Sequence, residues 1–289
     1  MKVLVFGENG QVAGELKSTL TLWSEVQFVG HEVAPFESPD RIVDIIRAYK
    51  PHFIVNAAAY TNVEKAESER DQAYLINGNT VGVIAEEAKK LGAGFIHYST
   101  DYVFDGSKNS AYTEVDQPKP LNVYGESKLL GEKLIQQVDG NSIILRVSWV
   151  YGNRGVNFYK TMLKLASERE ELKIVSDQIG APTWCRNIAE ATSIVLQDKD
   201  FMAKKGLYHM TSQGEVSWYG FAKKIFELYS HQNPTHPLKV KNLVQIETKD
   251  YPSKSQRPLN SRMSSQKIKE VFGLQLPHWE ESLKNVMNS

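Results

Sequence analysis

The sequence predicts an α/β protein built on a doubly wound parallel sheet with helices on both faces, followed by a smaller α/β region. Three observations predict this fold. Five short apolar segments alternate with amphipathic helical segments in the first 150 residues, which is typical of a parallel sheet with crossover helices. A glycine turn directly follows the first apolar segment. After Trp149 the regular alternation stops, which places a second region over residues 151–289.

Composition limits the kinds of partner. The chain of 289 residues suits one large domain or two modest ones. Its 34 basic and 34 acidic residues cancel, so we expect no nucleic-acid partner. The single cysteine, Cys185, cannot form an internal disulfide, which fits a cytoplasmic protein with one buried bystander thiol. No apolar window is long enough for a membrane span or signal peptide, so we expect no membrane contact.

The first strand is expected at residues 3–6, an apolar run that ends in a glycine turn. Gly7 lets the chain turn sharply, and Gly10 leaves room for a pyrophosphate against the amides of the following helix. Gln11 and Val12 begin that helix, and Ala13 supplies the small residue where helix and sheet meet. The spacing G-x-x-G-x-x-A is compatible with a nucleotide site and with an ordinary glycine turn.

A second strand is expected at residues 26–29, followed by Glu32. In a dinucleotide-binding fold this glutamate would accept a hydrogen bond from the adenosine ribose, and no arginine in the same loop would favour a 2′-phosphate. The pattern leans towards NAD over NADP, although a solvated loop glutamate explains it equally. Ser38 and Pro39 then cap a helix that runs to Tyr49.

The third strand, residues 52–55, runs into Asn56, Ala57 and Ala58. Small side chains at the end of a strand form a shelf for a flat ring or a ribose, and the Asn56 amide is placed to hydrogen-bond it. Ordinary tight packing explains the same residues. A long helix over residues 67–91, which includes Asn77, leads to the fourth strand at residues 95–98.

The fourth strand leads into Ser99 and Thr100, so Thr100 should lie at the carboxyl edge of the sheet, where open sheets bind ligands. The next helix begins near Tyr124 and carries Lys128 one turn further on the same face. An ammonium beside a phenol lowers the pKa of the phenol, so we expect Tyr124 to exchange a proton with a carbonyl oxygen near neutral pH. An ordinary helix carries the same pattern by chance. The fifth strand is expected at residues 143–147.

These motifs together resemble the extended short-chain dehydrogenase/reductase superfamily, which uses a Rossmann-type fold. Ala13 departs from the third glycine of the superfamily's turn. Five longer segments resemble, more narrowly, the dTDP-4-dehydrorhamnose reductase family, and they span nearly the whole chain: residues 56–67, 99–106, 146–152, 177–183 and 256–261.

This resemblance implies hydride transfer from NADPH or NADH to the C4 carbonyl of a dTDP-linked 4-keto-6-deoxy sugar, giving dTDP-L-rhamnose. Tyr124 would donate the proton, Lys128 would lower its pKa and hold the nicotinamide ribose, and Thr100 would hydrogen-bond the ketone oxygen. Asn77 would support a proton path behind Lys128. The residues expected to contact the cofactor are Gly7, Gly10, Gln11, Val12, Asn56, Ala57, Ala58, Tyr124 and Lys128. Those expected to contact the substrate are Thr100, Asp101, Tyr102, Trp149 and Arg257.

The resemblance assigns residues 1–150 to an NAD(P)-binding domain and residues 151–289 mainly to substrate binding, allowing for segments that return to the first domain. Trp149 would stack on the sugar or the thymine, or pack in the core. Arg257 would bind the diphosphate, or lie on the surface. Some family members hold a metal at a dimer interface with residues that match Glu15 and Glu190. We predict no metal here, and either a monomer or a homodimer.

Other activities on the same scaffold stay open. Sugar dehydratases carry an Asp-Glu pair after the active-site threonine, whereas Tyr102 follows Asp101 here, which argues against a dehydratase. A reductase or epimerase of another nucleotide-linked sugar is compatible with the motifs. So is a non-catalytic, NADP-binding regulatory subunit of the methionine adenosyltransferase type, although the intact set of Thr100, Tyr124 and Lys128 favours an enzyme.

Overall fold

The computed structural model describes all residues, 1–289. Its centre is a six-stranded sheet in which every pair of neighbours is parallel, in the order β10-β5-β4-β3-β1-β2. The fold predicted from the sequence is therefore confirmed. The strands of this sheet are β1 (Lys2–Phe6), β2 (Glu25–Val29), β3 (Phe53–Asn56), β4 (Gly94–Thr100), β5 (Ser142–Val147) and β10 (Gly206–His209).

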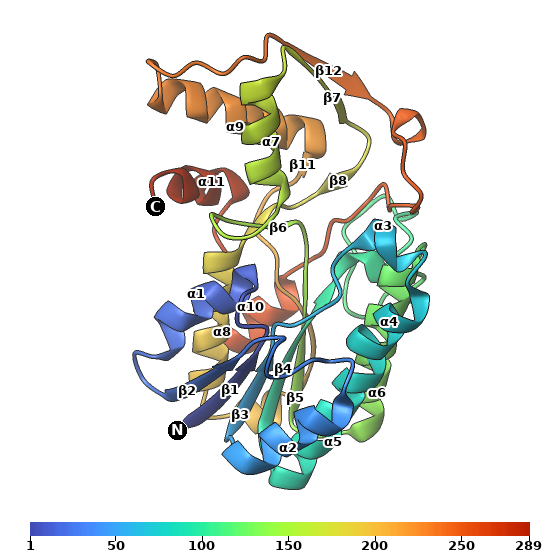
Figure 1. Ribbon diagram of the computed structural model, residues 1–289, viewed down its shortest axis with the longest axis vertical. Helices are drawn as coiled ribbons and strands as arrows, with labels where there is room; N and C mark the ends of the chain where they lie inside the picture. Colours follow the sequence, from blue (N-terminus) through green and yellow to red (C-terminus); the bar gives the residue numbers. More distant parts are fainter.

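Helices cover both faces of the sheet (Figure 1). On one face lie α1 (Gln11–Leu20), α8 (Cys185–Gln197) and α10 (Gln266–Phe272). On the other lie α2 (Pro39–Tyr49), α4 (Arg70–Tyr74), α5 (Thr80–Leu91) and α6 (Val123–Val138), with the short helix α3 (Val63–Ala66) above them. The central strands are apolar at successive positions because both faces are buried: Val3 and Val5 pack in one core, and Leu4 and Phe6 in the other.

The order of the strands reverses between β1 and β3, because the chain leaves β1 towards β2 and then returns to the other side of β1. Ligands of doubly wound sheets bind outside the carboxyl ends of the strands at such a switch point. Gly7 follows β1 there, and Ala57 and Ala58 follow β3. A Cβ built on Gly7 would lie 2.6 Å from backbone atoms of Ala57 and Ala58, so only glycine fits this junction.

A second, smaller part of the molecule lies beyond the carboxyl edge of the sheet (Figure 1). Its core is aromatic and includes Tyr151, Phe221 and Trp279. None of the helices combines the length and the apolarity needed to cross a bilayer. The helices of this part are α7 (Phe158–Glu168), α9 (Trp218–Gln232) and α11 (Trp279–Met287). Its short strands form three pairs: β6 (Val150–Tyr151) with β9 (Thr183–Trp184), β7 (Glu171–Val175) with β12 (Asn242–Ile246), and β8 (Ile179–Gly180) with β11 (Val216–Ser217).

Several elements differ from the sequence-based expectation. The helix expected over residues 67–91 is interrupted by a π-helical turn, Leu75–Asn79, between α4 and α5. Residues 178–184, for which the sequence showed no strand pattern, contain the short strands β8 and β9. We had not expected β10, α8 or α10, which bring the second half of the chain back to the main sheet. The division of the chain at residue 150 stays a prediction.

Gly7 should be far less tolerant of alanine than a second glycine with positive φ. Gly7→Ala combines the strain of φ +92° with overlap on the Ala57 backbone, so we expect a loss of about 2–4 kcal/mol of unfolding free energy. Gly92 also has positive φ, but nothing lies within 4 Å of its Cβ position, so Gly92→Ala should cost only about 1 kcal/mol. Urea unfolding of both variants measures the difference, and equal losses would contradict the packing argument.

Candidate active site

The glycine turn, residues 7–10, forms an open anion cradle at the start of α1. The Gly7 amide donates to Val29 O at 3.0 Å, and the Gly10 amide donates to Gly7 O at 2.8 Å, which fixes the turn. Gly10 is the N-cap of α1 and offers no side chain to the first-turn amides. These amides and the helix dipole suit a phosphate group, so the cradle fits a dinucleotide. Gln11 and Val12 are the first two residues of the helix.

The shelf, Asn56–Ala58, is held by its own hydrogen bonds. The Ala58 amide donates to Asn56 Oδ1 at 3.0 Å, and Asn56 Nδ2 lies 3.1 Å from His97 Nδ1. Both polar atoms of this buried amide are therefore bonded inside the protein. The Asn56 side chain organises the shelf instead of reaching across it, and a contact with a cofactor stays a prediction.

Tyr124 lies in the first turn of α6, which Asn122 caps by accepting from the Gly125 amide at 2.8 Å. Its phenol is half-buried and packs edge-on to the Tyr102 ring, with centroids 5.7 Å apart. Gly125 is required here, because any Cβ would collide with the Tyr102 carbonyl. The phenol of Tyr124 is thus held beside the end of β4.

Lys128 is almost fully buried one turn further along α6, with 2% of its surface exposed. Its Nζ donates to Tyr98 O at 2.6 Å and lies 3.2 Å from His97 Nε2. Burial lowers the pKa of Lys128 to about 7, although the Glu132 carboxylate opposes the shift. Glu132 itself pairs with the buried Arg146 at 2.6 Å.

The expected effect of Lys128 on Tyr124 is not found. Burial raises the pKa of Tyr124 to about 12, and the charge of Asp101 adds to the rise, while the Thr100 side chain offsets part of it. The expectation was wrong because it considered the ammonium and neglected desolvation, which disfavours the charged form of both groups. At neutral pH the phenol therefore keeps its proton.

Thr100 and Asp101 form one buried unit at the end of β4. Thr100 Oγ1 donates to Asp101 Oδ1 at 3.1 Å and accepts from the Tyr102 amide at 3.2 Å. Asp101 Oδ2 is buried without a partner. Burial raises the pKa of Asp101 to about 6, and the nearby Ser261 and Thr100 hydroxyls oppose the rise. Asp101 is therefore the one predicted substrate residue with an unsatisfied buried acceptor.

Asn77 lies in the π-helical turn and contacts the loop after the shelf. Its Oδ1 accepts from the Tyr60 amide at 2.9 Å, and its Nδ2 donates to Tyr60 O and to Ser127 Oγ, both at 3.0 Å. These bonds position α6 and the loop, and none reaches Lys128. A proton path through Asn77 stays a prediction.

Arg257 comes from the second half of the chain and meets Glu64 at 3.3 Å. Glu64 also accepts from Ser253 Oγ, Ser255 Oγ and the Lys254 amide, so one carboxylate clamps the loop that carries Arg257. These hydrogen bonds lower the pKa of Glu64 to about 2, against the effect of burial. The Arg257 Nε is buried without a partner, which leaves a donor for a ligand.

Trp149 has one face already covered. It stacks on Trp218 with ring centroids 3.5 Å apart and 6° between the planes. Its backbone has φ +46°, and its indole occupies the space where a Cβ of Gly180 would lie. A ligand could therefore contact only the rest of the half-buried ring.

Glu15 and Glu190 both form ion pairs with the side chain of Arg186. Arg186 lies 3.1 Å from Glu15 and 3.0 Å from Glu190, on the outer surface of α1 and α8. Glu32 is exposed in the loop after β2.

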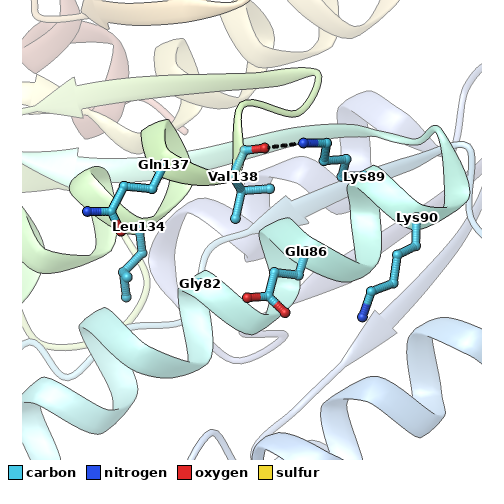
Figure 2. A pocket seen from close by; sticks show the side chains of 7 residues that line it. All are labelled: Gly82, Glu86, Lys89, Lys90, Leu134, Gln137 and Val138. Carbon is cyan, nitrogen blue, oxygen red and sulfur yellow. Dashed lines mark hydrogen bonds between the residues drawn. The ribbon is translucent and has the colours of Figure 1, made fainter.

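A surface pocket between α5 and α6 is lined by residues with no predicted role (Figure 2). Lys89 Nζ donates to Val138 O across it at 2.6 Å. Its lining residues are Gly82, Glu86, Lys89, Lys90, Leu134, Gln137 and Val138.

Comparisons with known proteins cover the whole chain. The family described as "RmlD substrate binding domain" matches residues 1–289. A dTDP-4-dehydrorhamnose reductase of Burkholderia thailandensis is 46% identical over 284 residues, which cover 96% of this chain and 95% of that protein. The dTDP-4-dehydrorhamnose reductase of Escherichia coli K12 is 42% identical and covers 100% of this chain and 97% of that protein. A crystal structure of the Bacillus anthracis reductase in complex with NADP has a TM-score of 0.91 at 33% identity, covering 99% of this chain and 98% of that one.

The fold, the glycine turn at the switch point and these relatives define the class: the chain is an extended short-chain dehydrogenase/reductase. Within that class, it belongs to the RmlD substrate-binding-domain family. The resemblance predicted from the sequence is confirmed. Both relatives are named as reductases, which agrees with the prediction that this chain is an enzyme.

Two parts of the site were missed by the sequence reasoning. One is His97, a histidine inside an otherwise apolar strand, and that position could have indicated a buried polar contact. The other is Glu64, which lies within the motif at residues 56–67 but reveals its partners only when residues 253–257 fold against it. The first could have been suspected from the sequence, and the second could not.

Asp101→Asn should stabilise the protein at neutral pH. The folded pKa of Asp101 is about 6 against 3.8 ordinarily, so the charged carboxylate destabilises the folded state above pH 6, and this cost disappears as the pH falls below 4. We expect the variant to gain about 1–3 kcal/mol at pH 7.5 and almost nothing at pH 4.

Asp105→Asn is the matched control, because backbone hydrogen bonding by Ser107 lowers the pKa of Asp105. Its carboxylate stabilises the folded state above the ordinary pKa, so this variant should lose stability at pH 7.5. Chemical unfolding at both pH values measures the two effects. A gain for Asp101→Asn that is independent of pH would contradict the charge-burial argument.

Proposed function

We propose that this protein reduces the C4 keto group of dTDP-4-dehydro-L-rhamnose to dTDP-L-rhamnose with NADPH or NADH. The observation that carries the proposal is the position of Thr100, Tyr124 and Lys128. They meet at the carboxyl edge of β4, next to the switch point where the glycine turn opens. Sequence identity of 46% and 42% to two dTDP-4-dehydrorhamnose reductases, over nearly the full length of the chain, supports the choice of substrate.

The cofactor's phosphates would lie on the amides of the glycine turn, and its rings near the shelf and Lys128. When bound, the nicotinamide supplies the hydride. The protein supplies orientation and the proton. Lys128 is fixed by the Tyr98 carbonyl at 2.6 Å, so its amino group can hold ribose hydroxyls without losing its place.

Tyr124 donates the proton to the ketone oxygen. A phenol with a pKa of about 12 is fully protonated at neutral pH, which is the form that a reduction needs. An alkoxide that forms as hydride arrives is more basic than a phenolate, so the transfer still runs downhill. The raised pKa therefore suits ketone reduction better than the lowered pKa that the sequence suggested.

Thr100 holds the ketone oxygen by turning its hydroxyl from Asp101 to the substrate. The hydroxyl proton now points to Asp101 Oδ1, so binding exchanges one hydrogen bond for another. The freed carboxylate, with Oδ2 already unpartnered, then accepts from a sugar hydroxyl. Arg257, steadied by Glu64, presents its free Nε–H to a diphosphate oxygen.

A substrate panel tests the reaction. Mixing the protein with NADPH or NADH and dTDP-4-dehydro-L-rhamnose should consume the reduced nicotinamide, followed by its absorbance. The dTDP-linked sugar should turn over faster than UDP- and GDP-linked 4-keto sugars. Cofactor binding without turnover of any sugar would point to a non-catalytic protein instead.

Tyr124→Phe should lower kcat by about 10²–10⁴-fold, because the proton donor is lost. The cofactor Kd should change less than about threefold, since the ring remains in place. Tyr49→Phe, which removes a phenol bonded to Glu25 O on the remote helix α2, is the control and should keep full turnover. Unchanged kcat in Tyr124→Phe would remove this residue from the donor role.

A further inference from the structure

His97 is the centre of a buried hydrogen-bond chain that joins the shelf to Lys128. The chain runs from the Ala58 amide to Asn56, from Asn56 to His97, and from His97 to Lys128, with distances of 3.0, 3.1 and 3.2 Å. Asn56, His97 and Lys128 are 1%, 0% and 2% exposed, so water cannot replace any of these bonds. The direction of each bond is therefore fixed by its neighbours.

The backbone amide of Ala58 sets the direction. It can only donate, so it faces Asn56 Oδ1, which leaves Asn56 Nδ2 to donate to His97 Nδ1. Nδ1 is thus the unprotonated ring nitrogen, which accepts the hydrogen bond. Burial alone holds the pKa of His97 below its usual value, so the ring is neutral and its proton lies on Nε2.

The Nε2–H group then points at Lys128 Nζ. An ammonium has three donors and no lone pair, so it cannot accept this hydrogen bond, whereas a neutral amine can. The amine also still donates to Tyr98 O. Protonating Lys128 would leave two donors face to face, or would reverse the whole chain and break the bond to the Ala58 amide.

Other charges around Lys128 do not change this result. The Glu132 carboxylate, which would favour an ammonium, is bound by Arg146 and by the Ser99 hydroxyl. Tyr124 keeps its proton and is uncharged. The titratable groups near Lys128 are His97 on β4 and, one turn away on either side along α6, Tyr124 and Glu132.

We propose that His97 is a positioning residue that keeps Lys128 as a neutral amine in the free protein, through the direction of the Asn56–His97–Lys128 hydrogen bonds. The inference rests on the proposed function at one point, which is that the cofactor lies beside Lys128. Its ribose oxygens and phosphates would favour the ammonium. Cofactor binding would therefore be coupled to uptake of a proton by Lys128.

Calorimetry of cofactor binding at pH 8 measures this proton. NADH is used first, because it lacks the titratable 2′-phosphate of NADPH, and the binding enthalpy is compared in phosphate, HEPES and Tris. About 0.9 proton should be taken up per site, because a group with a pKa of about 7 is mostly neutral at pH 8. Lys128→Met should abolish the uptake, and His236→Gln, at an exposed position, should retain it.

Two His97 variants separate charge control from a structural role. In His97→Gln the carboxamide can turn its oxygen to Lys128 and stabilise the ammonium before binding, so uptake should fall below about a third of the wild-type value. In His97→Phe the opposing N–H is lost and no acceptor replaces it, so uptake should fall to a value between those of wild type and His97→Gln. Equal uptake in wild type and His97→Gln, or no uptake in wild type despite binding, would overturn the proposal.

The tautomer provides a test that needs neither cofactor nor turnover. Nitrogen-15 NMR of the histidine rings, with His97→Gln for assignment, should show a protonated Nε2 and a bare Nδ1 at His97. A proton on Nδ1 would overturn the proposal whatever the calorimetry of the variants shows. If neither NADH nor NADPH binds, the proposed function fails, and the tautomer still decides the inference about His97.

Discussion

The burial of one lysine amine at the carboxyl edge of β4 constrains the rest of the site. Because Lys128 is removed from water, its Nζ must find partners among fixed groups, and it finds the Tyr98 carbonyl and the His97 ring. That requirement places α6 against β4. The π-helical turn packs against the same helix at Gly131, where a larger residue would strike the Asn77 carbonyl.

Removal from water shifts the pKa values of acids and bases in opposite directions. It lowers the pKa of Lys128 and raises those of Tyr124 and Asp101, so all three groups move towards their neutral forms. The neutral phenol of Tyr124 suits reduction, in which a proton must be available before charge develops. The buried carboxylate nearest to Lys128, Glu132, is held in a closed pair with Arg146.

Local patterns predicted the features that depend on near neighbours in the chain. The strands β1 to β5, the glycine turn and the Tyr124–Lys128 spacing could all be predicted from the sequence. The pKa of Tyr124 was misjudged because burial depends on the whole fold, and a two-residue pattern contains no information about it. The Glu64 clamp joins residues some 190 positions apart, and the stacking of Trp149 on Trp218 joins two distant segments, so neither leaves a local signal.

The return of the chain to the main sheet at β10 affects how the protein can be made. The outer edge of β5 is covered only when residues 206–209 arrive, and α1 receives its partner helix α8 from residues 185–197. A nascent chain that has emerged through residue 150 carries the complete Tyr-Lys pair but an open strand edge and a bare apolar helix face. The main sheet thus cannot be completed on the ribosome before most of the polypeptide has been synthesised, and a fragment that ends at residue 150 would be prone to self-association.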